Sequence, residues 1–253
     1  MLRPVPSTSY VEPPDSQMIL NAVAGRYGHP LFCFFFGSHA SGKGDAGSDV
    51  DLIAVLSRVD NAYRETFSSD GFLFDVQVHD PETLHYMMRM EQQNGVAILA
   101  GEVDEARVLP TGSDAALELK EVAHRIMASG SPLPRNWDVQ RRYLSSVLSD
   151  LERCTDVDEQ QVLAMSLYFR MMELYLRRHG QLLAGPGRHL VRSVRRFDAS
   201  FCDRAQAALA RLFREGSSSM LIDVGRDVLD LIGGPLTTGF RMDYPKEFRL
   251  PLL

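Results

Sequence analysis

The stretch Phe36-Gly37-Ser38, followed after ten residues by Asp49-Val50-Asp51, decides how the first half of this sequence folds. The apolar run Leu31–Phe36 predicts a buried strand that ends in the Gly-Ser turn, and Val50–Leu56 predicts a second strand. Residues i and i+2 of a strand project from the same face, so the two aspartates are expected to point the same way. Neighbouring carboxylates repel each other unless a cation lies between them, and Mg²⁺ or Mn²⁺ is the cation that prefers such oxygen ligands. The stretch therefore predicts a metal site that handles phosphate.

A third acidic residue belongs to this prediction. Asp75 lies in the middle of a strand predicted over Phe72–Val78, where a charge is otherwise unfavourable. If this strand lies beside the second one, Asp75 can join Asp49 and Asp51 around one or two metal ions. The alternative is an outward-facing residue on a half-exposed strand, and the acidic pair upstream favours the metal site.

The Gly-Ser turn supplies a place for phosphate. Gly37 lets the backbone approach a phosphate closely, and Ser38 offers an N–H and a hydroxyl at the start of a short helix. We expect a nucleoside triphosphate, most simply ATP, to lie with its β- and γ-phosphates on this turn. Asp75 would then help to deprotonate an acceptor hydroxyl, with Glu173 in the second half of the chain as the alternative base.

A second motif overlaps the same residues. Gly37-Ser-His-Ala-Ser-Gly42-Lys43 fits the first seven positions of a Walker A loop. The eighth position should be Ser or Thr, because its hydroxyl binds Mg²⁺, but Gly44 stands there. The loop should also open a long helix, whereas the residues after Gly44 predict a turn. The P-loop interpretation is therefore set aside.

The combination of Gly37-Ser38 with Ser48-Asp49-Val50-Asp51-Leu52 resembles the signature of DNA polymerase β-type nucleotidyltransferases. The pattern is most similar to the small bacterial branch that contains kanamycin and streptomycin nucleotidyltransferases and the minimal MNT proteins. The resemblance spans roughly residues 16–110. It implies an α+β fold, in which an N-terminal mixed-sheet nucleotidyltransferase domain is followed by a C-terminal α-helical bundle.

The resemblance also implies roles for single residues. Gly37 and Ser38, together with Ser48 of the signature, would hold the triphosphate, and Asp49 and Asp51 would bind metal. Asp75 would complete the catalytic and metal-binding triad. Relatives often carry an aromatic residue and an arginine where this chain has His39 and Ser41, and Lys43 is the candidate that replaces the lost positive charge.

The second half of the sequence is expected to be almost entirely helical. We expect an extended tail over residues 1–15, the nucleotidyltransferase domain over residues 16–129 and a helical bundle domain over residues 135–253, with Ser129–Pro134 as linker. A methionine- and tyrosine-rich span around Met171 could suggest a cofactor site but is more typical of a bundle core. The predicted helices are 16–27, 81–93, 113–128, 137–153, 157–179, 187–196, 199–215 and 217–232, and short strands are predicted at 95–99 and 103–109.

Composition restricts the setting and the partners. No apolar run is long enough to span a membrane, the proline-rich N-terminus does not resemble a signal peptide, and three widely spaced cysteines fit no metal pattern. A cytoplasmic protein with no membrane partner is expected. The net charge of −6 combines an acidic first half with a basic second half, whose arginines cluster over residues 188–214. This cluster could bind RNA, although a solvated helix face explains it as well.

Two classes of function remain. The first is an enzyme that transfers a nucleoside monophosphate from an NTP to a hydroxyl of an acceptor, such as an aminoglycoside, and releases pyrophosphate. An RNA or protein acceptor is the enzymatic alternative. The second class is a nucleotide-binding or regulatory module that kept the fold without catalysis, which the residues at His39 and Ser41 motivate. The acceptor, the nucleotide preference and the oligomeric state are not predicted by the sequence.

Overall fold

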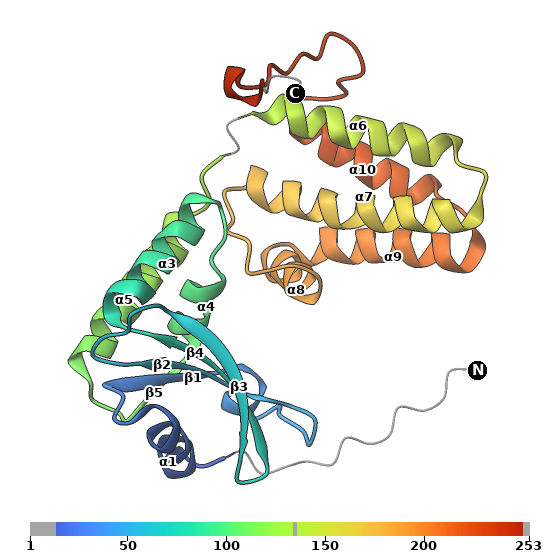
Figure 1. The fold of residues 1–253 in the computed structure, drawn as a ribbon. Helices are drawn as coiled ribbons and strands as arrows, with labels where there is room; N and C mark the ends of the chain where they lie inside the picture. The colour runs from blue at the N-terminus through green and yellow to red at the C-terminus, as the bar shows by residue number, and fades with distance from the viewer. Residues whose placement is uncertain (1–13, 134–135, 250–253) are drawn as a thin grey trace, which may run out of the picture. The chain divides into compact units, whose positions relative to one another are not determined.

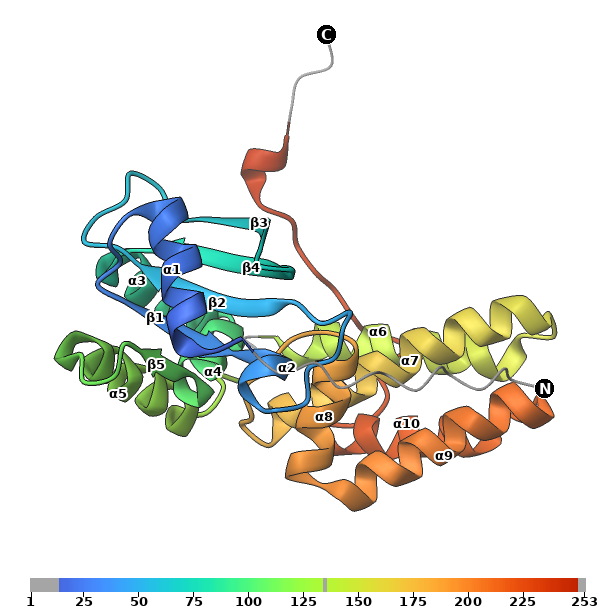
Figure 2. The same cartoon turned by 90° about the horizontal axis from the view of Figure 1, so that it is seen from below.

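The computed structural model describes residues 14–133 and 136–249. The chain divides into two compact units, residues 1–130 and 131–253. The first contains a five-stranded mixed sheet with helices and the second is helical (Figures 1 and 2), which confirms the predicted α+β class. Of the predicted tail only Pro14 and Asp15 are described, and Pro134 of the predicted linker also lies outside the described residues. Within the described ranges, no helix combines the length and the apolar character that a membrane span requires.

The sheet places the Gly-Ser turn and the acidic residues side by side. Its strand order is β3-β4-β2-β1-β5, and only β2 and β4 run parallel to each other. Asp51 on β2 lies opposite Phe36 on β1 and opposite Asp75 on β4. The central strands are apolar because both of their faces are covered. The strands are β1 (Phe32–Phe36), β2 (Val50–Val55), β3 (Tyr63–Ser69), β4 (Phe72–His79) and β5 (Arg107–Leu109).

Strand β3 is an edge strand that the sequence analysis did not predict. It pairs with β4 through a two-residue hairpin turn, Asp70-Gly71, in which both residues have positive φ (51° and 84°). An Asp-Gly pair is favoured in such turns because its backbone twist matches that of the strands. The sequence of β3, YRETFSS, is polar because one of its edges and much of its surface face solvent.

Helices cover both faces of the sheet (Figure 1). α1 (Ser16–Tyr27) packs on one face, where Ile19 and Val23 join a buried cluster with β-strand side chains. On the other side, α3 (Pro81–Gln93) contacts β4, α4 (Ile98–Glu105) contacts β1, and α5 (Asp114–Ser129) packs against both of these helices. Asp80 is the N-cap of α3, and Pro81 is its first residue, where a proline is favoured because its missing N–H has no partner in the helix.

The short strands predicted at 95–99 and 103–109 are mostly wrong. Residues Ile98–Glu105 form helix α4, and only Arg107–Leu109 forms a strand. The N-cap position of α4 is Ala97, which has no side chain that can cap a helix. The carboxylate of Glu91 on α3 instead accepts a hydrogen bond from the N–H of Leu99 at 2.8 Å. A cap that comes from another helix leaves no local signal in the sequence.

The second unit is a helical bundle with its own core. α7 packs against each of the other four long helices, and its Met171 and Met172 are fully buried. The methionine- and tyrosine-rich span is therefore a core seam, as predicted. Gly225 on α10 allows close packing, because a Cβ there would lie 2.8 Å from Leu148. The helices are α6 (Trp137–Arg153), α7 (Val157–Arg178), α8 (Arg188–Phe197), α9 (Ala199–Glu215) and α10 (Ser219–Leu231), followed by the short 3-10 helix η1 (Lys246–Phe248).

Candidate active site

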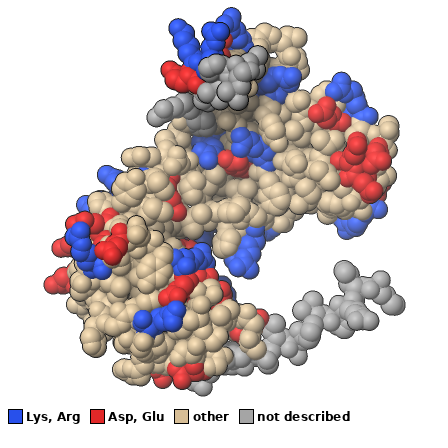
Figure 3. Space-filling model, viewed as in Figure 1, with Lys and Arg blue, Asp and Glu red and all other residues tan. Residues whose placement is uncertain are grey.

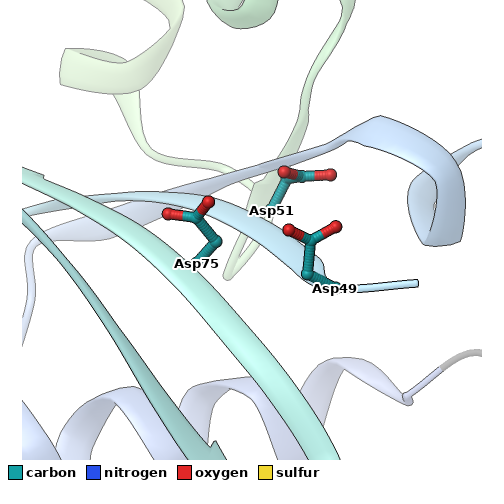
Figure 4. A group of neighbouring side chains, drawn as sticks. All are labelled: Asp49, Asp51 and Asp75. Carbon is teal, nitrogen blue, oxygen red and sulfur yellow. The ribbon is translucent and has the colours of Figure 1, made fainter. Parts of the chain in front are cut away.

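Three carboxylates lie together where β2 begins beside β4. Asp51 and Asp75 are direct neighbours in the parallel pairing of these strands, and Asp49 precedes the first residue of β2. One oxygen from each of the three lies within 4.8 Å of the others. Figure 4 shows the three side chains projecting to the same side of the sheet and towards one another. The structure thus brings together the three acids that the sequence analysis grouped.

This donor set fits a hard divalent cation. All three groups offer carboxylate oxygens, which Mg²⁺ and Mn²⁺ prefer over nitrogen or sulfur ligands. The three residues are half-buried, so their mutual repulsion is screened less than it would be on an open surface. A bound cation would remove that repulsion. Asp49, Asp51 and Asp75 are thus a group of residues that could hold such an ion.

An arginine that the sequence analysis missed is paired with one of these acids. Arg64 of β3 donates from Nε to one oxygen of Asp75 at 2.6 Å and from its terminal nitrogen to the other at 2.5 Å. The hydrogen bonds that Arg64 donates to Asp75 are the main reason that the pKa of Arg64 is raised. Figure 3 shows acidic and basic side chains next to one another over the strands. Asp75 is thus already bound by a positive charge on the protein itself.

Two features require glycine at position 37: its backbone conformation and the closeness of the Asp51 side chain. Its φ is +77°, which disfavours any residue with a side chain. A Cβ at this position would lie 1.9 Å from Oδ2 of Asp51. Gly37 begins the four-residue helix α2 (Gly37–Ala40), which follows β1 directly. The Gly-Ser turn and the acidic site are therefore in direct contact, and a methyl group would separate them.

The loop between α2 and β2 carries the other two candidate nucleotide-binding residues. α2 ends at Ala40, so the long helix of a Walker A motif is not formed here. Lys43 is exposed, and its backbone N–H donates to the carbonyl of Ser38 at 2.9 Å. The hydroxyl of Ser48 donates to Asp45 and accepts from the Asp45 N–H, both at 3.0 Å. Ser48 thus orders the loop, while Lys43 presents its side chain to solvent.

A fourth carboxylate lies close to this group. Glu102 of α4 accepts a hydrogen bond at 2.9 Å from Gln77, which is two residues beyond Asp75 on the same face of β4. Burial raises the pKa of Glu102 to about 7, with a smaller contribution from the negative charges of Glu91 and Asp51. Sequence analysis missed Glu102 because this residue lies between the two short strands predicted at 95–99 and 103–109, where no helix was expected.

In the helical unit, several charged candidates already have partners. Glu173, the alternative base, is bound by Arg170 at 2.6 Å and by Arg177 at 3.0 Å. In the arginine-rich span, three exposed arginines pair with acids of the same unit, and Arg188 and Arg192 on α8 are exposed as well. The three pairs are Arg195–Asp203, Arg204–Asp227 and Arg211–Glu215.

Comparison with known proteins gives a distant structural similarity but no match in sequence. No protein-family model matches this chain, and no curated protein matches it. Among solved structures it is similar to a nucleotidyltransferase-like protein from Exiguobacterium sibiricum 255-15, with 12% sequence identity and a TM-score of 0.44. The similarity covers 86% of this chain and 74% of that protein. Such a low identity and TM-score do not transfer a function, so the function of this chain has to be inferred from its own site.

Proposed function

We propose that this protein is a metal-dependent nucleotidyltransferase, which moves a nucleoside monophosphate from an NTP to a hydroxyl of an acceptor. AMP transfer from ATP is the simplest case. One observation carries the proposal: oxygens of Asp49, Asp51 and Asp75 lie within 4.8 Å of one another, and the carboxylate of Asp51 lies directly against Gly37 of the Gly-Ser turn. A phosphate-binding turn beside an acidic metal site is the combination that this reaction needs.

The proposed roles follow from this arrangement. Asp49 and Asp51 would hold Mg²⁺ or Mn²⁺, which would supply positive charge to neutralise the phosphate oxygens during transfer. Gly37 and Ser38 bind the triphosphate, with Lys43 and Ser48 on the adjoining loop. The acceptor oxygen forms a bond to the α-phosphorus, the bond between this phosphorus and the bridging oxygen breaks, and pyrophosphate leaves. Asp75 accepts the proton of the acceptor hydroxyl.

Two classes of acceptor are compatible with the charges of the chain. A cationic small molecule such as an aminoglycoside suits the acidic excess of the first half. An RNA acceptor would use the exposed arginines of α8, such as Arg188 and Arg192. The small molecule is the first choice, because three arginines in the arginine-rich span are already neutralised by acids.

The test is transfer of label from ATP. Purified protein is incubated with α-³²P-ATP, Mg²⁺ or Mn²⁺ and panels of aminoglycosides, RNAs and proteins, and the release of pyrophosphate is measured in parallel. Asp51→Asn should abolish both signals. Asp60→Asn is the matched control, because Asp60 is an exposed aspartate of the same unit away from the site. Transfer that persists undiminished in Asp51→Asn would contradict the proposal.

The same experiment separates the enzyme from a binding module. Metal-dependent binding of ATP without transfer to any acceptor would favour a nucleotide-binding or regulatory module of the same fold. If the protein binds neither metal nor nucleotide, both versions of the proposed function fail.

A further inference from the structure

The three acids are not held in place equally. Asp51 and Asp75 are fixed by the pairing of β2 with its two neighbours. Asp49 lies outside this pairing, because β2 begins at Val50. The position of Asp49 therefore depends on the loop that leads into it from α2.

One side chain reaches across this loop to the residue before Asp49. The imidazole of His39 on α2 lies with Nε2 at 3.1 Å from the carbonyl oxygen of Ser48. A carbonyl oxygen can only accept a hydrogen bond, so Nε2 carries the proton and donates it. His39 is only 2% exposed, and its ring packs edge-to-face against Phe72 with 5.6 Å between ring centroids. This contact therefore connects the Gly-Ser turn helix with the residue next to Asp49.

Nothing else that the structure describes bonds to the ring. Nδ1 of His39 is buried and has no hydrogen-bond partner among the described residues. Leaving a buried polar atom unpaired costs free energy. The hydrogen bond to Ser48 and the packing around the ring must therefore offset this cost. The bond to the Ser48 carbonyl is the one hydrogen bond that the ring makes among the described residues.

Gly44 closes the loop over the other side of the ring. A Cβ at Gly44 would lie 2.3 Å from Nδ1 and 2.6 Å from Cε1 of His39. No residue larger than glycine fits there without moving the imidazole. The histidine therefore explains why glycine stands at the position where a Walker A loop has a hydroxyl group.

We propose that His39 is a positioning residue, which holds Asp49 in the metal site through its hydrogen bond to the Ser48 carbonyl. The inference rests on the proposed function, because it assigns His39 a role in building that metal site. His39 touches neither metal nor substrate in this role. It acts by fixing the chain on which Asp49 is carried, and it couples that chain to the turn that binds phosphate.

The test is the binding of Mn²⁺ alone to the full chain. Binding is measured from the loss of the electron paramagnetic resonance signal of free Mn²⁺. His39→Phe keeps a ring against Phe72 but removes the donor, and should weaken Mn²⁺ binding by about 10-fold or more, as groups that orient metal ligands do. His39→Gln places an amide donor near the position of Nε2 and should restore much of the affinity. His29→Phe, at an exposed histidine of the same unit, should bind Mn²⁺ like the wild type.

A double-mutant cycle tests whether His39 acts through Asp49. In an Asp49→Asn background, His39→Phe should cause no further loss of Mn²⁺ affinity. The inference would be overturned if His39→Phe lowered the Mn²⁺ affinity of the Asp49→Asn protein as much as it lowers that of the wild type. It would also be overturned if the single variant His39→Phe bound Mn²⁺ as tightly as the wild type. In both cases the proposed function stands, because the wild type binds Mn²⁺. Failure of the wild type to bind Mn²⁺ would instead overturn the proposed function and the inference with it.

A second variant covers the case in which His39→Phe does not fold, which circular dichroism would report. Gly44→Ala retains the histidine but pushes a methyl group against its ring. It should weaken Mn²⁺ binding in the same way, whereas Ala46→Ser, at an exposed position of the same loop, should not. Wild-type Mn²⁺ affinity in a folded Gly44→Ala protein would overturn the inference.

Discussion

Arg64 and Asp75 form a bidentate ion pair, in which the guanidinium of Arg64 donates one hydrogen bond to each oxygen of the Asp75 carboxylate. The Arg64 side chain is 62% exposed and that of Asp75 only 12%. The pair places a positive charge at the edge of the acidic site. A metal ion that binds Asp75 has to share this carboxylate with Arg64 or displace it.

Removal of Arg64 should therefore strengthen metal binding. In Arg64→Met the three carboxylates keep their repulsion without a compensating charge, so a divalent cation gains more by binding. We expect Mn²⁺ affinity to rise by roughly 2- to 5-fold, which corresponds to the ~0.5–1 kcal/mol typical of a largely exposed pair. The metal-free protein should melt at a lower temperature than the wild type.

The chain offers a matched control for this prediction. Arg26 of α1 forms a similar two-bond pair with Glu65 of β3, on the sheet face opposite to that of Arg64. Arg26→Met should lower the melting temperature but leave Mn²⁺ binding unchanged. Weaker Mn²⁺ binding in Arg64→Met would mean that Arg64 supports the metal site instead of competing with it.

Neutralising Asp51 should abolish metal binding without lowering the stability of the metal-free protein. In Asp51→Asn the repulsion among the carboxylates falls, so the metal-free protein should melt at the same temperature as the wild type or slightly higher. Mg²⁺ with ATP should stabilise the wild type by about 2.7 kcal/mol at a ligand concentration of 100 times Kd, and should not stabilise Asp51→Asn. Thermal melts with and without ligand measure both effects. Equal stabilisation of the two proteins would place the ligand elsewhere.

The sequence predicts the acidic residues well because their positions depend on strand geometry. The spacing of Asp49 and Asp51 fixes their common face, and a single charged residue in an apolar strand marks Asp75. The α+β class follows from the same periodicity. These features are local, and each depends on only a few neighbouring residues.

The parts that were missed depend on distant contacts. Arg64 lies in a polar edge strand with weak periodicity, and the Asp70-Gly71 turn is the signal that could have revealed its hairpin. Glu102 lies in α4, which is capped by Glu91 from another helix. The contact between His39 and Ser48 joins residues nine positions apart in an irregular loop, for which no periodic pattern exists.

Gly37→Ala should damage the site more than its backbone strain alone explains. The positive φ at this position costs about 1–3 kcal/mol for a residue with a side chain. The new methyl group would also collide with Oδ2 of Asp51 and displace that carboxylate. We expect the melting temperature to fall and Mn²⁺ binding to be lost.

Gly42→Ala separates these two effects. Gly42 also has a positive φ (+69°), but a Cβ there would meet nothing within 4 Å. Backbone strain should destabilise this variant by a similar amount, but its affinity for Mn²⁺ should remain that of the wild type. If both variants bind Mn²⁺ equally well, the contact between Gly37 and Asp51 is not needed for the metal site.

Glu102 should make the metal-free protein less stable as the pH rises. Its pKa is raised to about 7 in the folded protein, mainly by burial, while the unfolded chain releases this proton near the ordinary value for glutamate. Between these two values the folded state binds more protons than the unfolded state, so the free energy of unfolding decreases with increasing pH. The stabilisation is fully present below pH ~4, and we expect roughly 3 kcal/mol to be lost by pH ~8. Glu102→Gln keeps a side chain of the same size and should remove this slope. Urea unfolding in EDTA at several pH values measures it, with Glu105→Gln as the exposed control on the same helix. The same pH dependence in Glu102→Gln and the wild type would show that another group is responsible.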